Sequence, residues 1–172
     1  GLSGTTDNFV YWAWKEGVTP GFDIVSCTGG TSADQLAHAS GVAHGLGVAP
    51  SMIILKGTSA TGAWYVYHTA LGTTKYILLN TTAASVTSGT WLASSTRFGS
   101  SIFTANTNVA YLFAEVAGFS KFGKYTGNGS ADGPFVWCGF RPRWIMVKRT
   151  NTTSPWFLID TDRDTYNRAQ NY

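Results

Sequence analysis

The apolar residues of this chain fall into short runs, which are separated by turns rich in Gly, Ser, Thr and Asn. Runs of β-branched and aromatic residues bounded by such turns are typical of β-strands. No long window carries the 3.6-residue apolar stripe of a helix, and only residues 32–39, which Ser32 is able to cap, suggest a short one. Strands are therefore expected at residues 8–15, 22–27, 51–57, 63–69, 75–80, 97–104, 110–115, 119–126, 135–138, 143–149 and 156–160.

Two stretches of the chain repeat each other. In each stretch a proline precedes an apolar run that ends in lysine, and a polar turn then leads to a run that begins with tryptophan. This order predicts a β-hairpin in each stretch, and the repetition predicts a tandem duplication. The residues that recur at one constant separation are Gly47/Gly139, Pro50/Pro142, Lys56/Lys148 and Trp64/Trp156.

These patterns define the expected fold. We expect an all-β protein with an antiparallel β-sandwich or jelly-roll-like architecture, built from a tandem β repeat. The first unit, with its N-terminal lead-in strand, covers residues 1–110, and the second, truncated unit covers residues 111–172. Because the second unit ends at the equivalent of Asn80, it lacks strands that would close its sheet. A homo-oligomer, stacked head to tail as a fibre or ring or closed as a trimer, would cover that edge.

Composition narrows the classes of function. The chain has 172 residues, of which 15% are aromatic and 12% are charged, and its net charge is +3. Many aromatics and glycines with few charges indicate a turn-rich, densely packed protein and not a disordered one. The low charge also gives a weakly hydrated surface, which suits a subunit of an assembly better than a free cytosolic monomer. So small a charge provides no concentrated basic face for nucleic acid, and no apolar run reaches the roughly 18 residues of a membrane span. Neither nucleic acid nor a membrane is therefore an expected partner.

The N-terminal sequence bears on the origin of the chain, and the positions of the two cysteines bear on whether they form a disulfide. The first residues lack the basic start and apolar core of a signal peptide, and a start without Met suggests a piece of a longer polypeptide. Cys27 and Cys138 occupy non-equivalent places in the two predicted units, so the repeat gives no reason to pair them. Free buried thiols are the favoured interpretation, and a disulfide is left open.

Residues able to carry catalysis or hold a metal form no recognisable motif. His38, His44 and His68 are not accompanied by a Gly-x-Ser-x-Gly elbow, so loop or surface histidines are expected. The acidic run from Asp160 to Asp164 lacks the glycine and the downstream glutamate of a calcium loop. We therefore expect no catalytic residues, no metal site and no cofactor.

Ligand contact has few candidates. A tryptophan at a matched repeat position favours a place in the core, whereas a tryptophan outside the matched set is a candidate for exposed contact with a sugar. The one basic cluster is a candidate for contact with an acidic glycan, or else supplies solvated charges that discourage aggregation of edge strands. The candidate ligand-binding residues are Trp91, Trp137, Arg141 and Arg143, while Trp64 and Trp156 are expected in the core.

Several longer strings resemble a known family. They include Tyr111-Leu-Phe-Ala-Glu-Val-Ala-Gly-Phe-Ser-Lys-Phe-Gly123, Tyr125-Thr-Gly-Asn-Gly-Ser-Ala-Asp-Gly-Pro-Phe135 and Gly139-Phe-Arg-Pro-Arg143. Together they resemble a repeat domain of tail-fibre and other virion structural proteins of tailed bacteriophages, especially those of marine and metagenomic origin. The resemblance covers nearly the whole chain and supplies no catalytic residues.

The resemblance implies a function and a location. The expected function is a non-catalytic structural or interaction module of a virion, such as a tail fibre or related appendage, so the expected location is the virion or the extracellular space. Other virion proteins are then expected partners besides further copies of the chain. A carbohydrate-binding, lectin-like module that recognises a host surface glycan is the alternative, and a host-glycan hydrolase is a weaker one.

Overall fold

The computed structural model describes residues 11–163 apart from residues 38 and 104. Within that part of the chain the regular structure is antiparallel β, with one short 3-10 turn, η1 (Thr69–Leu71), and no α-helix. The predicted all-β, antiparallel class is confirmed. The strands are β1 (Phe22–Thr28), β2 (Val42–Ala43), β3 (Met52–Gly57), β4 (Trp64–His68), β5 (Lys75–Leu78), β6 (Val86–Thr87), β7 (Trp91–Ala93), β8 (Arg97–Ser100), β9 (Thr107–Phe113), β10 (Trp144–Lys148) and β11 (Trp156–Asp160).

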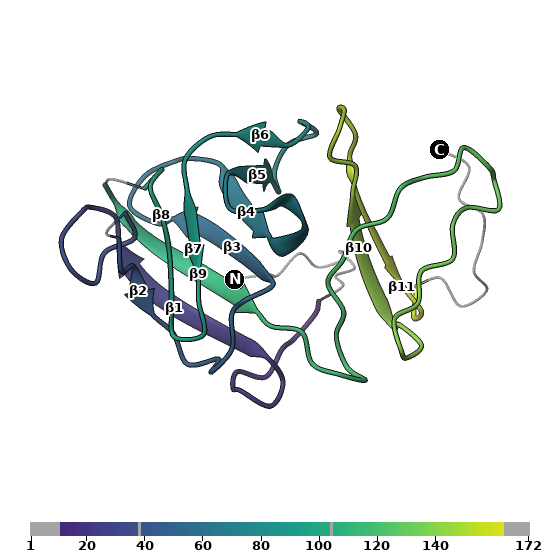
Figure 1. Cartoon of the computed structure of the whole chain (residues 1–172), viewed down its shortest axis with the longest axis horizontal. Coiled ribbons are helices and arrows are strands. Elements are labelled where there is room, and N and C mark those ends of the chain that lie inside the picture. Colours follow the sequence, from purple (N-terminus) through teal and green to yellow (C-terminus); the bar gives the residue numbers. More distant parts are fainter. Residues whose placement is uncertain (1–10, 38, 104, 164–172) are drawn as a thin grey trace, which may run out of the picture.

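Two of the sheets pack face to face in a sandwich-like arrangement (Figure 1). The larger sheet has the strand order β1-β9-β3-β4-β5-β6, and the smaller sheet has the order β2-β8-β7. Side chains alternate along each strand, so one face of the larger sheet supplies the shared core. The largest fully buried side chains of this core are Phe98, Leu36, Leu46, Ile53, Leu55 and Leu112.

The third sheet is the hairpin of β10 and β11, and it repeats the register of the hairpin of β3 and β4. In the first hairpin Lys56 lies opposite Trp64, and in the second Lys148 lies opposite Trp156. The two predicted hairpins therefore form, and their paired lysine and tryptophan occupy equivalent places.

A tandem repeat of the whole unit is not confirmed. The strands predicted at residues 119–126 and 135–138 do not form, because these residues find no strand to pair with in the described part of the chain. The boundary predicted between residues 110 and 111 falls inside β9, which pairs with β1 and β3 on both sides of that point. The strand predicted at residues 8–15 lies partly outside the described residues, and residues 11–15 are irregular.

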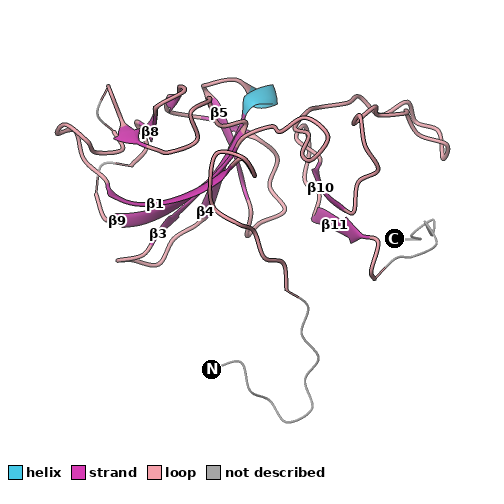
Figure 2. Cartoon of the chain, turned by 90° about the horizontal axis from the view of Figure 1, so that it is seen from below, coloured by secondary structure: helices cyan, strands magenta, loops and turns pink. Residues whose placement is uncertain are grey.

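Aromatic side chains join the β10–β11 hairpin to the sandwich, which it flanks in Figures 1 and 2. The indole N–H of Trp156 donates a hydrogen bond of 2.8 Å to the carbonyl oxygen of Leu78 in β5. The Trp14 ring contacts Trp144 of the hairpin and also Phe22 and Phe113 of the larger sheet. The hairpin therefore covers one part of the sheet face that points away from the sandwich core.

Both cysteine thiols are free, and they differ in environment. Cys27 is buried in the core between the sheets, whereas Cys138 is partly exposed. Burial raises the pKa of the Cys27 thiol to about 11, because a thiolate in an apolar environment loses its hydration. The interpretation as free thiols is confirmed, and the burial expected with it holds for Cys27 alone.

Candidate functional site

The outer face of the larger sheet, which points away from the sandwich core, has a covered half and an open half. Met52, Val66 and Ile77 are buried on the covered half, where Phe122 and Trp156 pack against them. On the open half the register brings side chains from four strands into one row across the sheet. That row consists of Ser26 on β1, Val109 on β9, Lys56 on β3 and Trp64 on β4.

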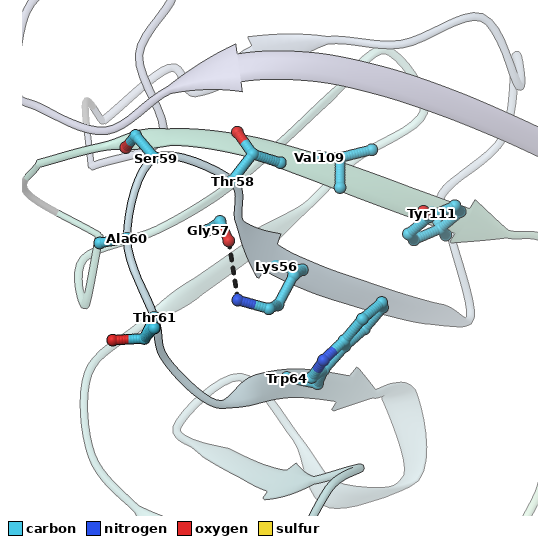
Figure 3. Close-up of a pocket in the computed structure, with 9 residues that line it drawn as sticks. All are labelled: Lys56, Gly57, Thr58, Ser59, Ala60, Thr61, Trp64, Val109 and Tyr111. Atoms are coloured by element: carbon cyan, nitrogen blue, oxygen red, sulfur yellow. Dashed lines mark hydrogen bonds between the residues drawn. The ribbon is translucent and has the colours of Figure 1, made fainter. Parts of the chain in front are cut away.

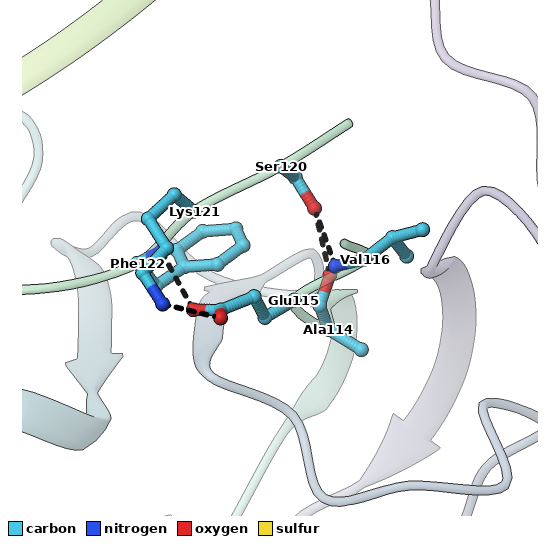
Figure 4. Close-up of polar contacts among 6 residues, drawn as sticks. All are labelled: Ala114, Glu115, Val116, Ser120, Lys121 and Phe122. Atoms are coloured by element: carbon cyan, nitrogen blue, oxygen red, sulfur yellow. Dashed lines mark hydrogen bonds and ion pairs between the residues drawn. The ribbon is translucent and has the colours of Figure 1, made fainter. Parts of the chain in front are cut away.

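A turn directly after β9 leads to Phe122, which packs on the covered half, and polar contacts hold this turn together (Figure 4). The Ser120 hydroxyl donates to the carbonyl oxygen of Ala114 and accepts a hydrogen bond from the N–H of Val116. Glu115 forms an ion pair of 2.6 Å with Lys121 and accepts a hydrogen bond from the N–H of Phe122. The hydrogen bond from Lys121 lowers the pKa of the Glu115 carboxyl, so the turn is held together at neutral pH.

An open groove of about 620 Å³ lies on the uncovered half (Figure 3). The rings of Trp64 and Tyr111 stand on β4 and β9, on either side of β3, with an interplanar angle of 17° and 6.4 Å between their centroids. The Lys56 side chain lies between these two strands. The remaining lining residues are Gly57, Thr58, Ser59, Ala60, Thr61 and Val109.

One wall of the groove is the β3–β4 loop, which is fastened to β9. The N–H and the hydroxyl of Thr58 both donate to the carbonyl oxygen of Thr107, at 2.8 and 3.1 Å. In return, the N–H of Thr107 donates to the Ser59 hydroxyl oxygen at 3.0 Å. A loop held by several hydrogen bonds presents its polar groups in a fixed geometry, and this reduces the entropy lost when a ligand binds.

Lys56 is the one charged residue among the lining residues that the structure describes. Its ammonium donates a hydrogen bond of 2.8 Å to the carbonyl oxygen of Gly57. An ammonium has three N–H donors, so this bond leaves donors for a ligand. No ion pair of Lys56 with an acidic side chain occurs within the described residues.

The four predicted contact residues lie outside this groove, and the structure does not bring them together. Trp91, a candidate for exposed contact, is only 2% exposed, because its strand β7 pairs with β8 and places its ring in the core beside Tyr67. That prediction is wrong. Trp137 is 76% exposed in an irregular loop, where its ring lies near Phe135.

The two arginines are also exposed. Arg141 precedes β10, and Arg143 pairs with Asp162 at 3.4 Å, with both side chains largely in solvent. Such exposed pairs contribute little to stability. The pair also uses part of the positive charge that the sequence offers to an acidic ligand.

Side chains of two histidines and of Asp160, in the acidic run, accept hydrogen bonds from backbone N–H groups. The Nδ1 atom of His44 accepts a hydrogen bond from the N–H of Leu46, and that of His68 accepts one from the N–H of Ala70. Asp160, which takes the place of His68 in the second hairpin, caps the following turn in the same way, through the N–H groups of Asp162 and Arg163. His38 and Asp164 lie outside the described residues, and among those that are described no cluster of three potential metal ligands occurs.

A family model, described as a domain of unknown function (DUF7483), matches residues 2–172. The chain belongs to the DUF7483 family. No curated protein and no solved structure matches this DUF7483 chain. The described part of the chain also has no helix of the length and apolar character needed to cross a membrane.

The residues of the groove were not predicted as a site from the sequence. Trp64 was expected in the core because it matches Trp156, but only Trp156 is docked on the sheet. A usable signal was present, since hairpin register places Lys56 and Trp64 side by side on one face. The position of Tyr111 beside them could not be predicted from the sequence, because it depends on the insertion of β9 between β1 and β3.

Proposed function

We propose that this DUF7483 domain is a non-catalytic carbohydrate-binding module of a virion structural protein. The observation that carries the proposal is the pair of nearly parallel aromatic rings, Trp64 and Tyr111, in an open groove with hydroxyl groups along one wall. The C–H face of a pyranose ring is apolar and slightly positive, and it fits the negative face of an aromatic ring. Hydroxyl and backbone groups then bind the sugar hydroxyls, the usual division of roles in a small-molecule site.

The groove chemistry supports binding without turnover. Glycosidases use two carboxyl groups on either side of the scissile bond, whereas the described residues that line the groove offer one ammonium, a phenol and aliphatic hydroxyls. The virion context, and with it an extracellular location, is supported by the resemblance of the long sequence motifs to virion repeat domains.

Binding of the full chain to a glycan array tests the proposal. Trp64→Ala and Tyr111→Ser are expected to weaken binding at least tenfold, which corresponds to about 1.4 kcal/mol. Trp137→Ala is the matched control, because it also removes an exposed aromatic ring but lies outside the groove. The proposal fails if no glycan binds, or if the control variant loses binding while the groove variants, folded by circular dichroism, retain it.

A second candidate function is a contact between subunits of an assembly. It is favoured by the exposed apolar side chains of the irregular segment between β9 and β10, since large exposed apolar surfaces mark interaction sites. The most exposed of them are Phe119, Tyr125, Phe135, Val136 and Trp137. Sedimentation tests the expected homo-oligomer: Phe135→Ser combined with Trp137→Ser should shift an oligomer toward monomers, and a monomeric parent chain at micromolar concentration would rule it out.

A further inference from the structure

We propose that the groove selects saccharides that carry a carboxylate, such as uronic acids, an inference that rests on the proposed carbohydrate-binding function. It follows from the charge of the groove. Lys56 contributes a positive charge, and none of the described residues that line the groove is acidic. The ligand class that complements this site carries a negative charge on a ring able to stack on the aromatic pair.

The position of Lys56 makes its charge effective. Lys56 pairs across the strands with Trp64 on one side and with Val109 on the other, so apolar groups surround its aliphatic stem. The side chain is only partly exposed, and less water screens it than a lysine in free solution. A carboxylate beside the stacked ring would therefore interact with Lys56 more strongly than with an exposed surface cation.

Several acidic groups in the described part of the chain have partners other than Lys56. Asp34 is paired with Arg97, Glu115 with Lys121, and the acidic groups beside β11 with Arg143 and Arg163. Asp23, the buried acid on β1, accepts a hydrogen bond from the N–H of Gly45. Because no ion pair of Lys56 occurs among residues 11–163 that the structure describes, its ammonium is available to the anion of a ligand.

The second hairpin provides an internal comparison. Lys148 occupies the same register position, and its ammonium donates to the carbonyl oxygens of Arg149 and Thr82. Its partner Trp156 is docked against the sheet by the hydrogen bond to Leu78. The same lysine–tryptophan pair is thus used for packing in one hairpin and is free for a ligand in the other.

The test compares matched probes on the full chain. Trigalacturonic acid, its carboxyl-reduced galactose counterpart and a sulfated galactose trisaccharide are measured by calorimetry, beside an array of neutral and uronic-acid glycans. The parent chain should prefer acidic over carboxyl-reduced partners at least tenfold, and added salt should reduce that preference. The sulfated probe distinguishes recognition of a carboxylate from attraction to any anion.

Substitutions test whether Lys56 causes the preference for acidic glycans. Lys56→Met keeps the aliphatic stem and removes the charge, so it should abolish the preference for acidic glycans by weakening their binding at least tenfold more than the binding of neutral glycans. Lys56→Arg should restore the preference, and Lys75→Met, which removes an exposed charge on β5 outside the groove, should not change it. Each variant is first shown to be folded by its thermal unfolding curve.

The outcomes separate the two proposals. Equal binding of neutral and acidic glycans, or a preference that persists in Lys56→Met, overturns the selectivity and leaves the carbohydrate-binding function standing. Stronger binding of the sulfated probe than of the uronic acid overturns the assignment to a carboxylate. Absence of binding to every glycan overturns the proposed function and the selectivity with it.

Discussion

Trp156 holds the β10–β11 hairpin on the sandwich, and its replacement should release the hairpin before the rest of the fold. A two-stranded hairpin alone is at best marginally stable in water, so its order depends on docking. Trp156 supplies an indole hydrogen bond to Leu78 and packs beside Met52, Val66 and Ile77. Trp156→Phe removes the hydrogen bond and keeps most of the ring, whereas Trp156→Ala removes both.

The expected magnitudes follow from these contacts. One hydrogen bond contributes a net of about 0.5–1.5 kcal/mol, and the lost part of the indole ring adds roughly 0.5 kcal/mol at about 25 cal/mol per Å². Trp156→Phe should therefore weaken docking by about 1–2 kcal/mol. Because Trp156 is partly exposed, Trp156→Ala loses roughly 100 Å² of burial, about 2.5 kcal/mol, in addition to the hydrogen bond.

Hydrogen exchange measures this release directly. Amides of β10 and β11 should exchange about 5–30 times faster in Trp156→Phe, while amides of β3 and β9 keep their protection. Trp137→Phe serves as the control, because that ring lies in solvent and its replacement should change neither set. Equally faster amide exchange in β9, or unchanged exchange in β10, would refute the view that Trp156 holds the hairpin on the sandwich.

Three further predictions concern titration, thiol chemistry and packing. Burial lowers the pKa of His68 below its ordinary value of 6.5, so the unfolded chain binds more protons in acid and the free energy of unfolding should fall as the pH drops below about 6.5. His68→Asn, which keeps a cap acceptor, should reduce that pH dependence in urea titrations, and an unchanged slope would contradict it. At about pH 8 a thiol reagent should modify Cys138 in the folded protein and reach Cys27 only after unfolding, because the raised pKa and burial protect that thiol; two rapid equivalents would argue against this. Phe98→Ala should lower the free energy of unfolding by about 3–5 kcal/mol, since its side chain is fully buried, and a loss below about 1 kcal/mol in a urea titration would be inconsistent with its place in the core.

Local patterns predicted the hairpins well. The apolar run before Lys56 and the aromatic run after Trp64 form β3 and β4, and the matching segments around Lys148 and Trp156 form β10 and β11. These elements are defined by residues close together in the sequence, namely a proline before the first strand and a polar turn between the strands. Their shared register follows from the equal spacing of the matched residues.

Long-range pairing could not be predicted in the same way. Trp91 lies in a segment of small polar residues that resembles a loop, yet its strand pairs with β8 and carries the ring into the core. The groove depends on Tyr111 meeting the β3–β4 hairpin, which only the placement of β9 determines. The segment between β9 and β10 has apolar residues typical of strands, but strand formation also needs a free partner edge.

The placement of β9 determines the order in which the strands of the larger sheet pair during folding. Among the described strands β1 pairs only with β9, so residues 22–28 must wait for residues 107–113 before their backbone groups find partners. The β3–β4 hairpin can close from neighbouring residues, whereas the β1–β9 and β3–β9 pairings require the closure of long loops, the step that slows proteins of high contact order. During synthesis β1 therefore leaves the ribosome as an unpaired strand and stays exposed until about 80 more residues have followed, the interval in which an edge strand is most open to pairing with another chain.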